Sequence, residues 1–240
     1  MPDDLPVLDR RALPRRGGNT LAGCAYDAIR AEIINGGLEP NQRLRLEDLR
    51  ERFAMGFSPI REALMQLYTE RLVVQEKMKG FRVAPISLEH LNDLCRVRIE
   101  IESLALRWAI ERGDADWEAD ILSAFHRLSK ERKRDERTAH GIDAAWRDRH
   151  RTFHLSLVAA CGSTQLLPIC ESLFDQSERY VALSIRHRDE PRDDLGEHKA
   201  MMDAAIARDV DRTIKLCACH IQRTTDKVVA SATLFADAAE

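Results

Sequence analysis

The sequence predicts a mostly α protein in which a small N-terminal winged helix-turn-helix precedes an antiparallel all-α bundle of about six helices. Three observations predict this fold. Aromatic residues make up only 5% of the chain, while helix-favouring Ala, Leu, Arg and Glu are abundant. Apolar residues recur every three or four positions along most of the chain. The exception is a pair of short β-like runs around a glycine near residue 80.

The length of 240 residues allows two domains of unequal size. We expect a flexible tail rich in Pro, Arg and Gly at residues 1–18, a winged helix-turn-helix at 19–86 and a helical domain at 87–240. Residues 1–87 hold 14 Arg and Lys against 12 Asp and Glu, a net charge of +2, whereas the remainder carries −5. This asymmetry is compatible with nucleic-acid contact by the first part only.

The sequence predicts a cytoplasmic protein with no membrane partner. No run approaches the roughly 18 apolar residues that cross a bilayer, and the N-terminus lacks the apolar core of a signal peptide. The six cysteines lie in apolar, helix-like contexts without paired spacing, which indicates reduced and buried thiols.

Three short helices are predicted in the first domain. The first runs from Thr20 to the glycines at 36–37, and the second covers residues 46–53. The third opens with Ser58 as its N-cap and Pro59 at the first helical position. The side chains expected on its buried stripe are Ile60, Leu64, Leu67 and Tyr68.

Two β runs at 72–76 and 81–84 then flank a basic turn that contains Lys79 and Gly80. Three helices followed by such a hairpin predict a DNA-binding module, with the third helix in the major groove and the wing along the backbone or minor groove. On pattern alone, a helical subdomain with an incidental hairpin remains open.

The stretch from Leu21 to Ala84 carries the skeleton P-x-x-x-L, S-P-I-R-E-A-L and G-x-x-V. This resembles the DNA-binding domain of the GntR family of bacterial transcription regulators. The resemblance implies DNA contacts by Ser58, Arg61, Lys79 and Gly80, although Arg61 could instead pair within its own helix. The family commonly has Ser-Arg-Thr before the proline, where this chain has Gly56-Phe57-Ser58. Because Phe57 cannot make the bidentate contact of an arginine with guanine, we expect the operator to differ at that base.

Helices are predicted in the second domain at residues 88–112, 114–137, 140–161, 164–189, 191–208 and 210–236. His150 and His154 are four residues apart, so they share one helix face, while His198 and His220 lie in later helices. Each histidine taken alone is more often a surface or core residue. A bundle of this kind can nevertheless build a ligand site from inward-facing side chains of several helices.

The four histidines also resemble a motif of the FCD effector-binding domain, which occurs in the FadR-like branch of the GntR family. There, a D-x-x-x-H pattern and two later histidines bind a divalent metal. The matching positions are His150, His154, His198 and His220, with zinc the first expectation and nickel or another transition metal the alternative. His150 stands where the family usually has Asp. An all-imidazole set should leave the ion's +2 charge uncompensated and hold an anionic effector more strongly.

The resemblance implies a small organic acid as effector. We expect Arg98 to pair with its carboxylate; a structural salt bridge of Arg98 with Glu102 or another acid is the alternative role. We therefore expect a homodimeric repressor that binds double-stranded operator DNA and is modulated by this acid. The rival is a cytosolic metal-dependent hydrolase with an accessory basic domain. Against it, Arg151 follows His150 where an H-E-x-x-H protease has Glu, and no nucleophile motif or phosphate loop is present.

Overall fold

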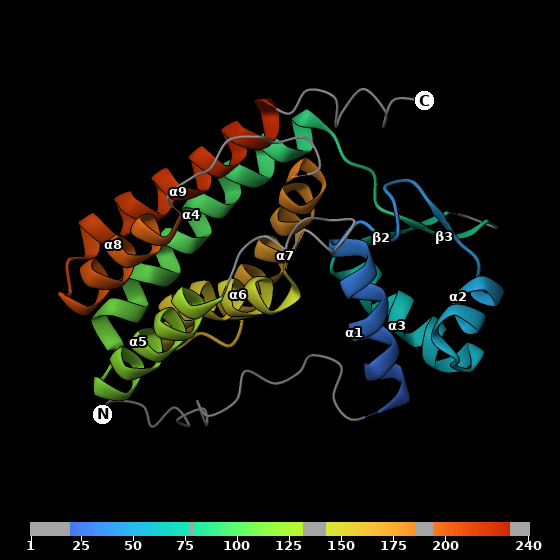
Figure 1. The fold of residues 1–240 in the computed structure, drawn as a ribbon, viewed down its shortest axis with the longest axis horizontal. Helices are drawn as coiled ribbons and strands as arrows, with labels where there is room; N and C mark the ends of the chain where they lie inside the picture. The colour runs from blue at the N-terminus through green and yellow to red at the C-terminus, as the bar shows by residue number, and fades with distance from the viewer. Residues whose placement is uncertain (1–19, 77–78, 132–142, 186–193, 231–240) are drawn as a thin grey trace.

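The computed structural model describes residues 20–76, 79–131, 143–185 and 194–230. Figure 1 shows two parts side by side: an N-terminal part, residues 20–83, and a larger helical bundle, residues 88–230. The predicted tail at 1–18 and the predicted helical extensions at 132–137, 186–189 and 231–236 lie outside the described residues.

The N-terminal part is a winged helix-turn-helix, as predicted. A three-stranded antiparallel sheet in the order β1-β3-β2 packs with three helices. Its elements are α1 (Leu21–Ile34), β1 (Arg43–Leu44), α2 (Leu46–Phe53), α3 (Phe57–Thr69), β2 (Val73–Glu76) and β3 (Gly80–Val83). The sequence analysis missed β1, because two residues are too short to show the alternation of a strand.

The helices α1 and α3 form the core of this part with their apolar faces. Thr20 caps α1, since its hydroxyl oxygen accepts the Gly23 N–H at 3.0 Å. The fully buried side chains include Ala25, Tyr26, Ile29, Ile33, Ile60, Leu64 and Leu67. This packing fixes the orientation of α3, whose opposite face is left exposed.

The start of α3 differs from the prediction. The helix begins at Phe57 with Gly56 as N-cap, so Ser58 lies in the first turn and is not the cap. Gly56 has the extended backbone that an N-cap needs, and Pro59 still falls among first-turn residues whose N–H groups have no helical partner. The prediction for Tyr68 was also wrong, because this side chain is 44% exposed.

The bundle contains six α-helices within the described residues, in agreement with the prediction. Three of them begin at polar N-caps: Ser87, Asp114 and Asp143 accept first-turn N–H groups. The elements are α4 (Leu88–Arg112), α5 (Ala115–Lys130), α6 (Ala144–Val158), the short 3-10 turn η1 (Ala159–Cys161), α7 (Leu166–Ile185), α8 (Asp194–Ile206) and α9 (Val210–Ala230).

The long helix α4 packs against α6, α7 and α9. All six cysteines are free, but Cys24 and Cys219 are exposed, so the expectation of buried thiols fails for these two. Across the described part of the chain, no helix combines the length and apolar character that a bilayer crossing requires.

The helix α7 joins the bundle to the N-terminal part (Figure 1). Its Asp175 is buried and accepts hydrogen bonds from Arg30 Nε of α1 at 3.2 Å and from Arg151 Nε of α6 at 3.0 Å. One turn later, Arg179 donates to the carbonyl oxygen of Ala84, just after β3. Polar contacts from α7 therefore reach both α1 and the segment that follows β3.

Candidate metal centre

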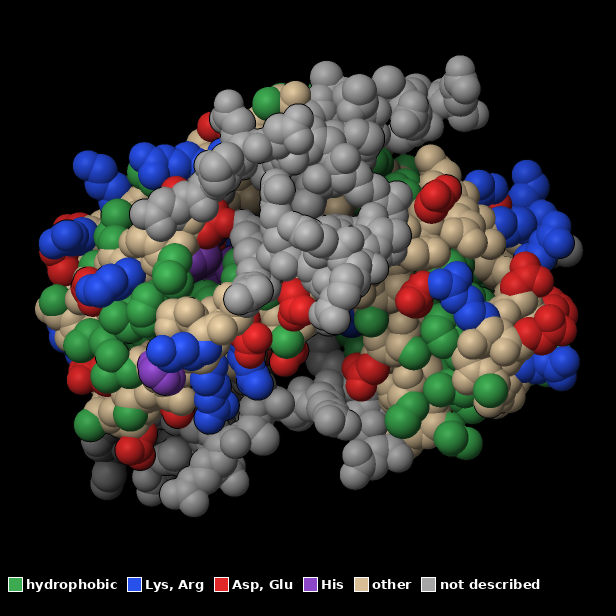
Figure 2. All heavy atoms as spheres, in the orientation of Figure 1, with side chains coloured by type: hydrophobic (Ala, Val, Ile, Leu, Met, Phe, Trp, Pro, Cys, Tyr) green, Lys and Arg blue, Asp and Glu red, His purple; other side chains and the backbone are tan. Residues whose placement is uncertain are grey.

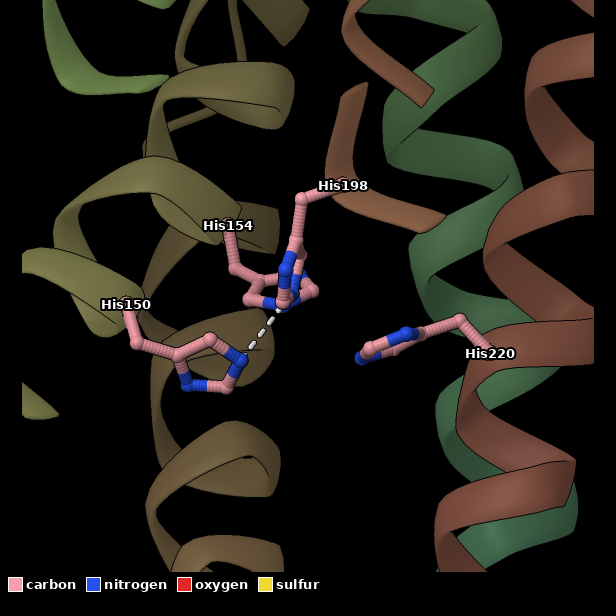
Figure 3. Close-up of side chains that lie close together, drawn as sticks. All are labelled: His150, His154, His198 and His220. Carbon is pink, nitrogen blue, oxygen red and sulfur yellow. Dashed lines mark hydrogen bonds between the residues drawn. The ribbon is translucent and has the colours of Figure 1, made fainter. Parts of the chain in front are cut away.

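Four histidine side chains from three helices converge inside the bundle (Figure 3). His150 and His154 lie one turn apart on α6, His198 comes from α8 and His220 from α9. One ring nitrogen of each histidine lies within 4.8 Å of the corresponding atoms of the other three. His154 Nε2 is 3.1 Å from Nε2 of both His150 and His198. All four rings are buried.

This donor set fits a transition-metal ion. Imidazole nitrogens bind zinc at roughly 2.0–2.1 Å, so two of them on one tetrahedral ion lie roughly 3.3 Å apart. The two separations of 3.1 Å are close to that spacing. Magnesium and calcium prefer oxygen ligands, whereas imidazole suits zinc, nickel and copper.

Two carboxylates lie close to the Nδ1 atoms of two of the histidines. Glu197 Oε2 lies 2.8 Å from His220 Nδ1, and Glu178 Oε1 of α7 lies 3.7 Å from His150 Nδ1. His150 Nδ1 is buried and has no hydrogen-bond partner within the described residues. Metal-binding histidines usually donate the second ring N–H to such a carboxylate, which fixes the ring and its tautomer.

These carboxylates correct the charge argument made from the sequence. The replacement of Asp by His150 was expected to leave a divalent ion's +2 charge uncompensated. Glu178 and Glu197 supply two negative charges directly behind two of the rings. An unusually strong hold on an anionic effector therefore does not follow from His150 alone.

The protonation states favour metal binding. Burial lowers the pKa of His154 well below its usual value near 6.5, and the other three histidines and Arg98 lower it further. His154 is then neutral at physiological pH, the form that binds a metal. For Glu178, burial by itself raises the pKa, but the charges of His150, Arg147 and Arg98 outweigh burial and lower it.

Arg98, the candidate effector ligand, lies on α4 and is 5% exposed. Its Nε donates to Glu102 Oε1 at 2.6 Å, so the ion pair considered as its alternative role is present. The guanidinium also lies 5.3 Å from the ring centroid of Phe174. Because the bond to Glu102 uses Nε, the two terminal nitrogens keep their capacity to donate.

The sequence analysis missed the contributions of Phe174, Asp175 and Glu178 to this region. One signal was available: these residues lie in an α7 segment in which ionisable residues interrupt an apolar helix. Buried carboxylates are rare unless they are paired. The spacing alone did not show that this side of α7 faces both the histidines and α1.

The predicted DNA contacts are exposed on the N-terminal part. Ser58 and Arg61 lie at the start of α3, and the side chain of Arg61 makes no hydrogen bond or ion pair within the described residues. Lys79 and Gly80 lie where β3 begins, and Gly80 has φ +87°, a conformation that favours glycine. Figure 2 shows Lys and Arg side chains gathered at the edge of the β2–β3 hairpin that faces away from the bundle.

Phe57, the residue at which the operator was predicted to differ, is 46% exposed at the first position of α3. The guanidinium of Arg50 lies 5.0 Å from its ring centroid. This aromatic side chain therefore occupies the exposed end of the helix beside a cation.

Comparisons with known proteins follow the same division of the chain. Residues 21–83 match the family described as bacterial regulatory proteins, gntR family, and residues 93–223 match the FCD domain. The chain is 35% identical to the HTH-type transcriptional regulator BphR of Paraburkholderia xenovorans, over 95% of this chain and 93% of that protein. It is 37% identical to the HTH-type transcriptional repressor GlaR of Escherichia coli, over 82% of this chain and 90% of that protein.

Among solved structures, E. coli McbR/YncC superposes with a TM-score of 0.74, covering 88% of this chain and 98% of that one. The sequence identity over this superposition is 19%, so the likeness shows a shared fold.

Proposed function

This chain belongs to the GntR family of bacterial regulatory proteins and carries an FCD domain, and from this premise we propose a homodimeric repressor controlled by a small organic acid at a divalent metal. That it is a DNA-binding transcription regulator with an effector-binding domain, and not an enzyme, follows from its family and its relatives. The rival interpretation as a hydrolase is therefore set aside.

In this proposal α3 enters the major groove of the operator. Arg61 is exposed and unpaired within the described residues, so its guanidinium is available to a base edge, while Ser58 contacts the backbone. Lys79 contacts phosphate from the hairpin, and Gly80 lets the chain approach closely. Two such domains in a dimer read a pseudo-palindromic operator.

His150, His154, His198 and His220 would hold the metal, with zinc the first choice. When bound, the ion supplies a positive charge, and a carboxylate oxygen would join the four imidazoles as a fifth ligand. Arg98 would pair with the same carboxylate through its terminal nitrogens. A cavity of about 680 Å³ between α8 and α9 borders His220. Arg212, Lys215 and Arg223 line it together with Glu197, which pairs with Arg223, so the lining keeps a net positive charge that favours an anionic ligand nearby.

The observation that carries the proposal is the convergence of four buried histidines next to the helix that contacts the N-terminal part. On α7, Glu178 faces His150, while Asp175, three residues earlier, pairs with Arg30 of α1. A ligand that favours one placement of α7 would therefore shift the placement of the DNA-binding part.

The test is a mobility shift on the DNA upstream of the protein's own gene, with zinc-loaded protein and a panel of small organic acids. We expect one acid to weaken the wild-type complex and to have no effect on His154→Ala, which should bind DNA but not metal. An acid response that is unchanged in His154→Ala would overturn the role of the metal. Light scattering should give the mass of a dimer.

A further inference from the structure

A second cavity, of about 160 Å³, lies between the N-terminal part and the bundle, with walls from α1, α6 and α7. None of the four metal-site histidines lines it. An engineered protein cavity of about 150 Å³ holds benzene, so this one has room for about six non-hydrogen atoms. The cavity therefore fits a small ligand that would touch both parts of the chain at once.

Three arginines line this cavity, and two of them are already neutralised. Arg30 of α1 and Arg151 of α6 both bond to Asp175, which is 1% exposed. Arg151 also pairs with Glu171 at 3.4 Å. These bonds hold the walls in place and leave little unsatisfied charge at the two side chains.

The side chain of the third arginine, Arg147 of α6, makes no hydrogen bond or ion pair within the described residues. Its Nε is buried without a partner, and burial lowers its pKa although Glu178 acts in the opposite direction. Glu178 lies 3.7 Å from His150 Nδ1. This nitrogen would donate to the Glu178 carboxylate once His150 binds a metal through its other ring nitrogen. The guanidinium of Arg147 is partly buried, and an anionic ligand would give it the direct partner that it lacks within the described residues.

The other walls narrow the class of ligand. A planar guanidinium pairs bidentately with a carboxylate. Ile34 and Phe174 offer apolar contact to the rest of the molecule, whereas Asp148 and Glu178, which also line the cavity, disfavour a second negative charge. The lining therefore suits one carboxylate on a short apolar chain.

We propose that this interdomain cavity is a second ligand site, in which Arg147 binds the carboxylate of a small monocarboxylic acid. The ligand would contact α1 on one side and, on the other, α6 next to its metal ligand His150. A regulatory effect on DNA affinity rests on the function proposed above, whereas binding itself does not.

The test is titration calorimetry of zinc-loaded, full-length protein with butyrate, its neutral analogue butyramide and the dianion succinate. We expect butyrate to bind at least about tenfold more tightly than either. Its single carboxylate pairs with the Arg147 guanidinium, whereas butyramide carries no charge and succinate brings a second negative charge. Equal binding of butyramide, or tighter binding of succinate, would overturn the assignment. The absence of measurable butyrate binding to the wild type would overturn it as well.

Two variants locate the site. Arg147→Gln removes the cation without breaking a bond present in the structure, and Ala31→Phe fills the cavity from an exposed position on α1. Both variants should bind butyrate about tenfold or more weakly than the wild type. Arg149→Gln, a matched change on the same helix, should keep the wild-type affinity. Loss in His154→Ala with retention in Arg147→Gln would place the acid at the metal centre and refute the second site. The reverse result would support this site even if the metal-bound acid proposed above proved wrong.

Discussion

Replacing Asp175 with Asn tests the buried bridge between the two parts of the chain. Asp175 is 1% exposed and accepts bonds from Arg30 of α1 at 3.2 Å and Arg151 of α6 at 3.0 Å. The amide keeps the size of the side chain but removes the charge that both arginines share. Removing one partner of a buried ion pair costs about 3–5 kcal/mol. Because the arginine side chains are 18% and 23% exposed, water screens part of the loss, and we expect about 3 kcal/mol.

Urea unfolding measures this loss with two signals. The three tryptophans, Trp108, Trp117 and Trp146, all lie in the bundle, so their fluorescence follows the bundle alone, whereas far-UV circular dichroism follows both parts. In Asp175→Asn we expect the dichroism transition to begin at lower urea than the fluorescence transition, because the N-terminal part unfolds without the bridge.

Glu171→Gln is the control, since its pair with Arg151, at 3.4 Å, is longer and partly exposed. Its cost should stay below about 1 kcal/mol. If Asp175→Asn lost no more stability than this control and its two transitions coincided, the reasoning about the bridge would be refuted.

Further predictions concern DNA and pH. Arg61→Ala should lose about 1–3 kcal/mol of DNA-binding free energy and relax specificity at one base. Lys79→Ala should weaken binding to all sequences equally and reduce the dependence of log affinity on log salt concentration by about 1. Fluorescence anisotropy on single-base operator variants distinguishes the two. Phe57→Arg should move the sequence recovered by binding-site selection toward the commoner family operator, and an unchanged selection would contradict the role assigned to this position. In metal-free protein the lowered pKa of His154 makes the folded state bind fewer protons than the unfolded chain, so stability is complete above about pH 6.5 and falls below it. Equal melting temperatures at about pH 5.5 and 7.5 would contradict this.

Much of the architecture could be predicted because helical periodicity is a local property. The spacing of His150 and His154 places both on one face of a helix whatever surrounds it. That His198 and His220 reach the same point depends on how α8 and α9 pack against α6, and only the family resemblance indicated it. The resemblance likewise identified Ser58 and Arg61 as exposed candidates on α3.

The remaining features depend on tertiary packing that one sequence does not reveal. Asp175 and Glu178 have the spacing of a solvated helix face, and their burial follows from the contact of α7 with α1 and α6. Tyr68 continues the apolar stripe of α3, yet it lies at the exposed end of the helix. Ser58 has the preferred chemistry of an N-cap, but the left-handed Ala54 turns the chain so that Gly56 takes that position.

The most direct test of the metal centre is X-ray absorption at the metal edge, combined with the metal content of the purified protein. We expect one transition-metal ion per chain, bound by imidazole nitrogens at roughly 2.0–2.1 Å, and loss of the ion in His154→Ala with the helical content retained. A protein that binds no ion from a zinc solution, or whose ion has a first shell of oxygen and sulfur only, would contradict the account.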